Sequence, residues 1–110
     1  MTVKLPRAIK AYFAADRDGG PDELAASFTE NAKVKDVGET IVGHEAIRQW
    51  KIDYSGKFGP TTIEPFFITT QNDKIQVMAH VAGDFPGSPV DLKYFFVLAG
   101  DKVAELEITV

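Results

Sequence analysis

Residues 61–110 read TTIEPFFITTQNDKIQVMAHVAGDFPGSPVDLKYFFVLAGDKVAELEITV, and this half of the chain decides the fold. Apolar and polar residues alternate along much of it, which is typical of β-strands. Turn-forming residues interrupt the alternation at 72–73, 86–89 and 100–101. Because these turns are short, consecutive strands should form an antiparallel meander, with Pro65 at an edge or a bulge. The predicted strands span about 61–71, 74–84, 89–99 and 102–110.

The first half of the chain reads mainly as helices. Apolar residues at helical spacing predict a first helix over about 5–16. Pro21 opens a second helix, whose apolar face is expected to include Phe28. A third helix is predicted over about 44–55, with Gly56 as its end.

A strand pair lies between the second and third helices. Ala32, Val34 and Asp36 share one face of the first strand, and two lysines lie on the other face. Residues 39–42 look like its extended partner. Helices laid on one face of this sheet make a two-layer α+β fold.

Length and composition limit the classes of function. A chain of 110 residues predicts a single domain over 1–110. The chain has no cysteine and carries a net charge of −4, so we expect no thiol chemistry, no basic face for nucleic acid and a cytoplasmic location. No segment reads as a signal peptide or a membrane span, so no membrane partner is expected.

Two of the predicted strands are apolar on both faces. Residues 92–98 carry Tyr94 and Phe96 on one side and Phe95 on the other, and 75–82 are similar. A strand of this kind needs cover on both faces. Since the helices can cover only one face, we predict a homodimer through the outer face; an exposed apolar face without a partner is the alternative.

Asp36 is the strongest candidate for a reactive group. Its face of the strand is otherwise apolar, and burial disfavours the charged form of a carboxylic acid. A carboxylate that can hold a proton near neutral pH serves as a general base or acid. The alternative is an aspartate that caps the following turn. Tyr12 shares the apolar face of the first helix, either as a donor to a substrate oxygen or as an ordinary core tyrosine.

Further side chains are candidates for shaping a pocket around these two. Aromatic residues on the third helix, polar residues in the strand at 74–84 and a lysine within an apolar strand could all face a cavity. Each also has a purely structural interpretation, as core, surface or salt-bridge residue. The histidines are too far apart in the sequence to suggest a metal site, and no cofactor motif is present. The predicted pocket residues are Trp50, Tyr54, Met78, His80, Lys93 and Phe95.

Residues 11–50, AYFAADRDGGPDELAASFTENAKVKDVGETIVGHEAIRQW, resemble the nuclear transport factor 2-like superfamily. They are most similar to its SnoaL-like branch, which includes polyketide cyclases and is related to ketosteroid isomerases. The closing GDKVAELEI, residues 100–108, is similar to the family's last strand. The resemblance implies a cone-shaped fold, in which three helices of the N-terminal half pack into a strongly curved, mainly antiparallel sheet. It also implies a pocket between the layers and frequent dimers.

The resemblance assigns roles to two residues. Asp36 matches the general base of the isomerases, and Tyr12 matches their oxyanion-binding tyrosine. The isomerases complete that oxyanion site with a protonated carboxylic acid. That position falls near Lys93 here, which departs from the steroid isomerase pattern.

Three hypotheses of function follow. The first is a cofactor-independent isomerase, cyclase or lyase that uses Asp36 on a small apolar carbonyl compound. The second is a protein that binds a small apolar ligand in the same pocket without catalysis. The third is an interaction domain whose outer sheet face is the functional surface, because one fold can host many activities.

Overall fold

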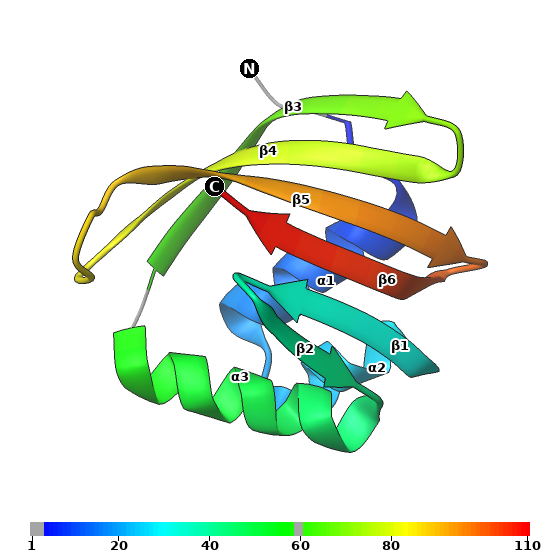
Figure 1. Ribbon diagram of the computed structural model, residues 1–110, viewed down its shortest axis with the longest axis horizontal. Helices are drawn as coiled ribbons and strands as arrows, with labels where there is room; N and C mark the ends of the chain where they lie inside the picture. Colours follow the sequence, from blue (N-terminus) through cyan, green and yellow to red (C-terminus); the bar gives the residue numbers. More distant parts are fainter. Residues whose placement is uncertain (1–3, 59–60) are drawn as a thin grey trace.

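The structure is a computed structural model that describes residues 4–58 and 61–110. Over that part the chain forms three helices and a six-stranded open sheet of mixed direction, which confirms the predicted α+β class (Figure 1). The helices are α1 (Arg7–Asp18), α2 (Pro21–Ala26) and α3 (His44–Phe58). The strands are β1 (Phe28–Asp36), β2 (Glu39–Val42), β3 (Thr61–Gln71), β4 (Lys74–Gly83), β5 (Val90–Ala99) and β6 (Lys102–Thr109).

The last four strands form the predicted antiparallel meander. The order across the sheet is β2-β1-β6-β5-β4-β3, so β3 lies at one edge. Pro65 lies in this edge strand, and the pairing with β4 shifts register between Pro65 and Phe67. Proline has no N–H to donate to a ladder, and both an edge and a bulge tolerate that loss. The prediction for Pro65 is confirmed.

One strand pair departs from the antiparallel pattern. β1 runs parallel to β6, with Val34 opposite Leu106 and Asp36 opposite Ile108. A parallel pair needs a long crossover, and here the crossover is the whole chain between the two strands. As a result β1 lies between the last strand, β6, and the short edge strand β2 (Figure 1).

The helices pack against one face of the curved sheet (Figure 1). The buried side chains alternate along each strand, as Val77, Ala79 and Val81 do in β4. An aromatic group fills the centre, where the Tyr12 ring lies 5.5 Å from that of Phe96 in an edge-to-face arrangement. Packing of this kind makes the inner face of the sheet the core and leaves the outer face to solvent.

Three element boundaries differ from the sequence-based expectation. α1 begins two residues later than predicted, at Arg7, and ends at Asp18. Phe28 is not on a helix: α2 ends at Ala26, and Phe28 begins β1 with 1% of its surface exposed. α3 continues through Gly56, because a glycine inside a helix costs only about 1 kcal/mol relative to alanine.

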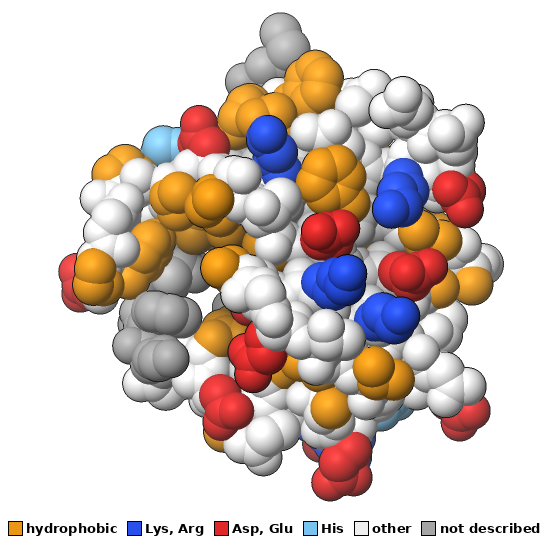
Figure 2. Space-filling model, viewed as in Figure 1, with side chains coloured by type: hydrophobic (Ala, Val, Ile, Leu, Met, Phe, Trp, Pro, Cys, Tyr) orange, Lys and Arg blue, Asp and Glu red, His pale blue; other side chains and the backbone are white. Residues whose placement is uncertain are grey.

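The outer face of the sheet is charged as well as apolar. Figure 2 shows basic and acidic side chains interspersed over β1 and β6. The register explains the pattern, because Lys33 lies opposite Glu105 and Lys35 opposite Glu107. None of the described helices, over 4–58 and 61–110, has the length and apolar character needed to cross a membrane.

Candidate active site

A cavity of about 580 Å³ lies between the helices and the inner face of the sheet. The surface is hollowed on the left of the view in Figure 2, between α3 and the strands above it. One wall of the cavity is aliphatic and comes from β3 to β6. The other wall is polar and aromatic and comes from α1, β1 and α3. The aliphatic residues are Ile63, Val81, Val90, Leu92 and Ile108.

Asp36 lies on this cavity at the end of β1. Ala32 and Val34, on the same face of the strand, are fully buried, and Lys33 and Lys35, on the other face, are exposed. The side chain of Asp36 is half-buried, and its Oδ2 accepts a hydrogen bond of 2.9 Å from Nε1 of Trp50. Within the described residues Oδ1 has no hydrogen-bond partner, and no basic side chain forms an ion pair with the carboxylate. Oδ2 of Asp36 is therefore fixed by a hydrogen bond, and Oδ1 has no hydrogen-bond partner among the described residues.

The chain leaves β1 through a tight turn next to Asp36. Val37 and Gly38 both have positive φ, 45° and 86°. A two-residue hairpin turn of type I′ requires positive φ at both residues, and glycine adopts it readily. Val37 is a β-branched residue in the left-handed region, which is a strained arrangement.

Tyr12 of α1 lines the same cavity, with 2% of its surface exposed. No hydrogen bond to its hydroxyl is found in the described part of the chain. Among the described residues, every polar side-chain atom that is completely shielded from solvent has a hydrogen-bond partner. The Tyr12 hydroxyl has no partner among them, so it is not completely shielded and is open to the cavity. Burial raises the pKa of Tyr12 well above its usual value, and the Asp16 carboxylate raises it further. The phenol therefore stays protonated and can donate a hydrogen bond.

Tyr94 of β5 repeats this arrangement. Its ring is 4% exposed, it lines the cavity, and its hydroxyl has no partner among the described residues. Burial raises the pKa of Tyr94, and the Asp16 and Asp36 carboxylates raise it further. Sequence reasoning placed Tyr94 on an apolar strand face but did not identify it as a site residue.

Trp50 and Tyr54, both on α3, line the cavity. They lie four residues apart on one side of the helix, and their rings meet edge to face at 5.0 Å. Each donates a hydrogen bond to a different carboxylate: Trp50 to Asp36, and Tyr54 to Asp16. One face of α3 thus positions two acids on the cavity wall.

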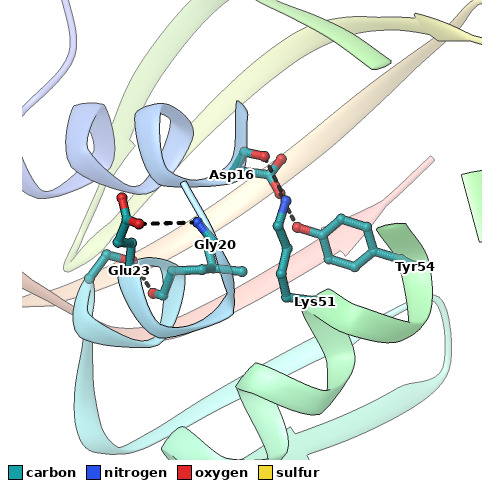
Figure 3. A network of polar contacts seen from close by, with 7 residues as sticks. Asp16, Gly20, Glu23, Lys51 and Tyr54 are labelled. Atoms are coloured by element: carbon teal, nitrogen blue, oxygen red, sulfur yellow. Dashed lines mark hydrogen bonds and ion pairs between the residues drawn. The ribbon is translucent and has the colours of Figure 1, made fainter. Parts of the chain in front are cut away.

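Asp16 belongs to a second polar group that sequence reasoning missed (Figure 3). Nζ of Lys51 donates to the backbone oxygen of Asp16 at 2.7 Å and lies 3.4 Å from its Oδ1. The side chains of Lys51 and Asp16 are only 10% and 11% exposed. Burial and the Asp16 carboxylate raise the pKa of Tyr54, so its hydroxyl remains a donor. Asp16 lies 35 positions before Lys51 and 38 before Tyr54 in the chain, so no local pattern links it to them.

Four predicted pocket residues do not line this cavity. Met78, His80, Lys93 and Phe95 lie on the opposite face of the sheet from the buried residues of β4 and β5. Nδ1 of His80 is 2.8 Å from Oδ1 of Asp91, on the exposed surface. The prediction that these four residues line the pocket is wrong. Both faces of β4 and β5 are apolar, and the face that turns toward the helices is the one that carries Tyr94.

His44, the first residue of α3, contacts the first residue of β1. One ring nitrogen lies 2.9 Å from the backbone oxygen of Phe28, so this side chain holds the start of α3 against the start of β1. Among the described residues, His, Asp and Glu side chains do not gather in threes that could hold a metal ion.

The family model described as a SnoaL-like domain matches residues 9–106. A proposed polyketide cyclase from Sinorhizobium meliloti is 37% identical, with a TM-score of 0.88 and alignment over 96% of this chain and 95% of that chain. No match was found among the curated proteins.

Two further solved structures share the fold at low identity. A protein from Catenulispora acidiphila with a ketosteroid isomerase-like fold, crystallised with trimethylamine, is 18% identical, with a TM-score of 0.84 over 97% of this chain and 87% of that chain. TerC, crystallised with polyporic acid, is 18% identical, with a TM-score of 0.78 over 93% of this chain and 87% of that chain. At this identity the likeness concerns the fold alone.

Proposed function

Because the chain belongs to the SnoaL-like domain family, as its sequence predicted, we propose that it is a cofactor-independent isomerase, cyclase or lyase. Its substrate is a small, largely apolar carbonyl compound. One observation carries the proposal: Asp36 and Tyr12 line one cavity, and each keeps an oxygen without a hydrogen-bond partner among the described residues. The volume of about 580 Å³ is within the usual range of small-molecule sites, roughly 300–1,000 Å³.

Asp36 is the proton acceptor in this proposal. The other carboxylate, Asp16, is already bound by the ammonium of Lys51 and the hydroxyl of Tyr54. From the described residues Asp36 accepts only the neutral indole N–H of Trp50, at Oδ2, which leaves Oδ1 able to accept a proton. Oδ1 takes a proton from the carbon next to the substrate carbonyl.

Tyr12 stabilises the charge that this step creates. The electron pair of the broken C–H bond moves onto the carbonyl oxygen and gives an enolate. The protonated Tyr12 hydroxyl donates a hydrogen bond to that oxygen, and burial strengthens the interaction. In an isomerase, Asp36 then returns its proton to another carbon. In a cyclase, the enolate carbon attacks a second carbonyl carbon of the same molecule, and the oxygen of that carbonyl takes the proton from Asp36.

Isotope exchange tests the assignment without knowledge of the natural substrate. In D₂O the protein should accelerate loss of the hydrogens at C2 of 1-tetralone, a bicyclic ketone, as followed by proton NMR. Asp36→Asn should reduce this rate by about a hundredfold or more. Asp91→Asn, which removes a carboxylate from the exposed surface, is the matched control. Full exchange by Asp36→Asn would show that the base is another group.

A non-catalytic binding protein is the second candidate. The aliphatic wall of the cavity favours it, because apolar pockets bind ligands without any chemistry. Binding of 1-tetralone by the wild-type protein with no exchange at C2 would select this function.

We also propose that a second copy of this chain packs on the outer face of the sheet. Lysines of β1 alternate there with glutamates of β6, so the face carries both partners of an ion pair, beside the half-buried Phe95. Sedimentation should therefore give twice the monomer mass, and Phe95→Glu should give monomers. A monomeric wild-type protein would exclude this arrangement.

The cytoplasmic location and the absence of nucleic-acid partners stay predictions of the sequence.

A further inference from the structure

Asp16, Lys51 and Tyr54 form a polar group on the cavity that the proposed mechanism does not use (Figure 3). We call these three residues the Asp16 cluster. It joins the last turn of α1 to the middle of α3. Lys51 also lies 4.9 Å from the centre of the Tyr54 ring, so the three side chains are in mutual contact.

Stability alone is a weak reason for such a cluster. Both charged side chains are about one-tenth exposed, and removing an ion pair from water offsets most of its attraction. Apolar residues of similar size often stabilise a fold as well as a buried pair does. The position of the cluster on the cavity wall gives it a second use.

The cluster keeps hydrogen-bonding capacity after its internal contacts are made. An ammonium has three hydrogens, and Lys51 uses two of them on Asp16. The Tyr54 hydroxyl donates its hydrogen to Asp16, and its own oxygen still has lone pairs to accept with. The cluster therefore offers a ligand one donor and one acceptor side by side.

The charge of the cluster selects the ligand group. Asp16 and Lys51 cancel, so an anionic group bound here would add a charge with no counterion in a largely dehydrated place. A hydroxyl is neutral, accepts from Lys51 and donates to Tyr54, and so uses both remaining sites.

We propose that the Asp16 cluster binds a hydroxyl group of the ligand, and that the substrate carries this hydroxyl in addition to its carbonyl group. This rests on the proposed function for the placement of the carbonyl end at Asp36. The hydroxyl subsite itself needs only the Asp16 cluster and the cavity.

Matched ligands test the subsite by binding. The chain has a single tryptophan, so the indole N–H of Trp50 gives one nitrogen–proton NMR signal that reports on the cavity. The probes are 1-tetralone, 6-hydroxy-1-tetralone and 1-tetralone-6-carboxylate. The hydroxylated ketone should bind the wild-type protein about tenfold more tightly than the parent ketone, the usual effect of a hydrogen bond to a charged group. The carboxylate should bind no better than the parent.

Variants separate the subsite from general stability. Lys51→Met should remove the tenfold advantage of the hydroxyl, and Lys35→Met, a lysine on the outer face, should keep it. Tyr54→Phe, which leaves the ion pair intact, should also reduce the advantage and serves if Lys51→Met does not fold.

Equal binding of the hydroxylated and parent ketones by the wild-type protein would overturn the subsite, as would tighter binding of the carboxylate or no binding of any probe. Exchange at C2 is measured on the same samples. Exchange that depends on Asp36 without a hydroxyl advantage would refute the subsite alone. A hydroxyl advantage without exchange would refute the catalytic proposal alone.

Discussion

All three tyrosines of the chain lie on the cavity, and this predicts an unusual response to alkaline pH. Burial raises the pKa of Tyr12, Tyr54 and Tyr94 above the usual value of about 10. The unfolded chain loses these protons near pH 10, and the folded protein keeps them. A group whose pKa is raised by folding contributes stability that is complete below the unfolded pKa and is lost as pH rises above it.

The size of the effect follows from the count of tyrosines. Each group that stays protonated only in the folded state lowers the free energy of unfolding by about 1.4 kcal/mol per pH unit above pH 10. Three tyrosines therefore lower it by about 4 kcal/mol between pH 9 and pH 11. That loss is a large part of the roughly 5–15 kcal/mol that holds a small domain folded.

Absorbance at 295 nm, which reports tyrosinate, should stay flat until the protein unfolds, and should then rise together with the loss of circular dichroism. Urea unfolding at pH 9, 10 and 11 should give the predicted slope, and Tyr94→Phe should reduce it by about a third. Tyrosinate that appears near pH 10 in protein with native circular dichroism would refute the burial argument.

Three other substitutions test separate parts of the structure. Val37→Asn should raise the free energy of unfolding by about 1 kcal/mol in urea, because Val37 is 74% exposed and strained at a positive φ that asparagine tolerates. Trp50→Phe keeps an aromatic ring but removes the donor to Asp36, so exchange of 1-tetralone should slow by about tenfold with little change in ligand affinity. Phe96→Ala should lower the free energy of unfolding by about 3–5 kcal/mol, because the ring is completely buried; a loss under 1 kcal/mol would show that the core there is loose.

Much of the fold could be predicted because it is encoded locally. Alternation and turn residues placed β3 to β6 within about one residue of their observed ends. The same alternation put Asp36 on the apolar face of β1, where the structure has it. Helix boundaries were less accurate, because Gly56 and the residues around Phe28 are compatible with more than one local structure.

The inner face of β4 and β5 was decided only by the tertiary structure. Both faces of these strands are apolar, so periodicity could not say whether Phe95 or Tyr94 turns toward the helices. In the structure Tyr94 faces the helices and packs against the rings of Phe13 and Tyr12. The same face of the sheet is the inner one in β4, so Met78 and His80 lie on the outer face.

The pairing of distant residues was also beyond the sequence. The parallel contact of β1 with β6 sets Asp36 beside Ile108, and the Asp16 cluster joins Asp16 to residues 35 and 38 positions later in the chain. Local patterns record which way a side chain faces along its own helix or strand. Which acid meets which donor depends on how the helices close over the sheet, and only the assembled fold determines it.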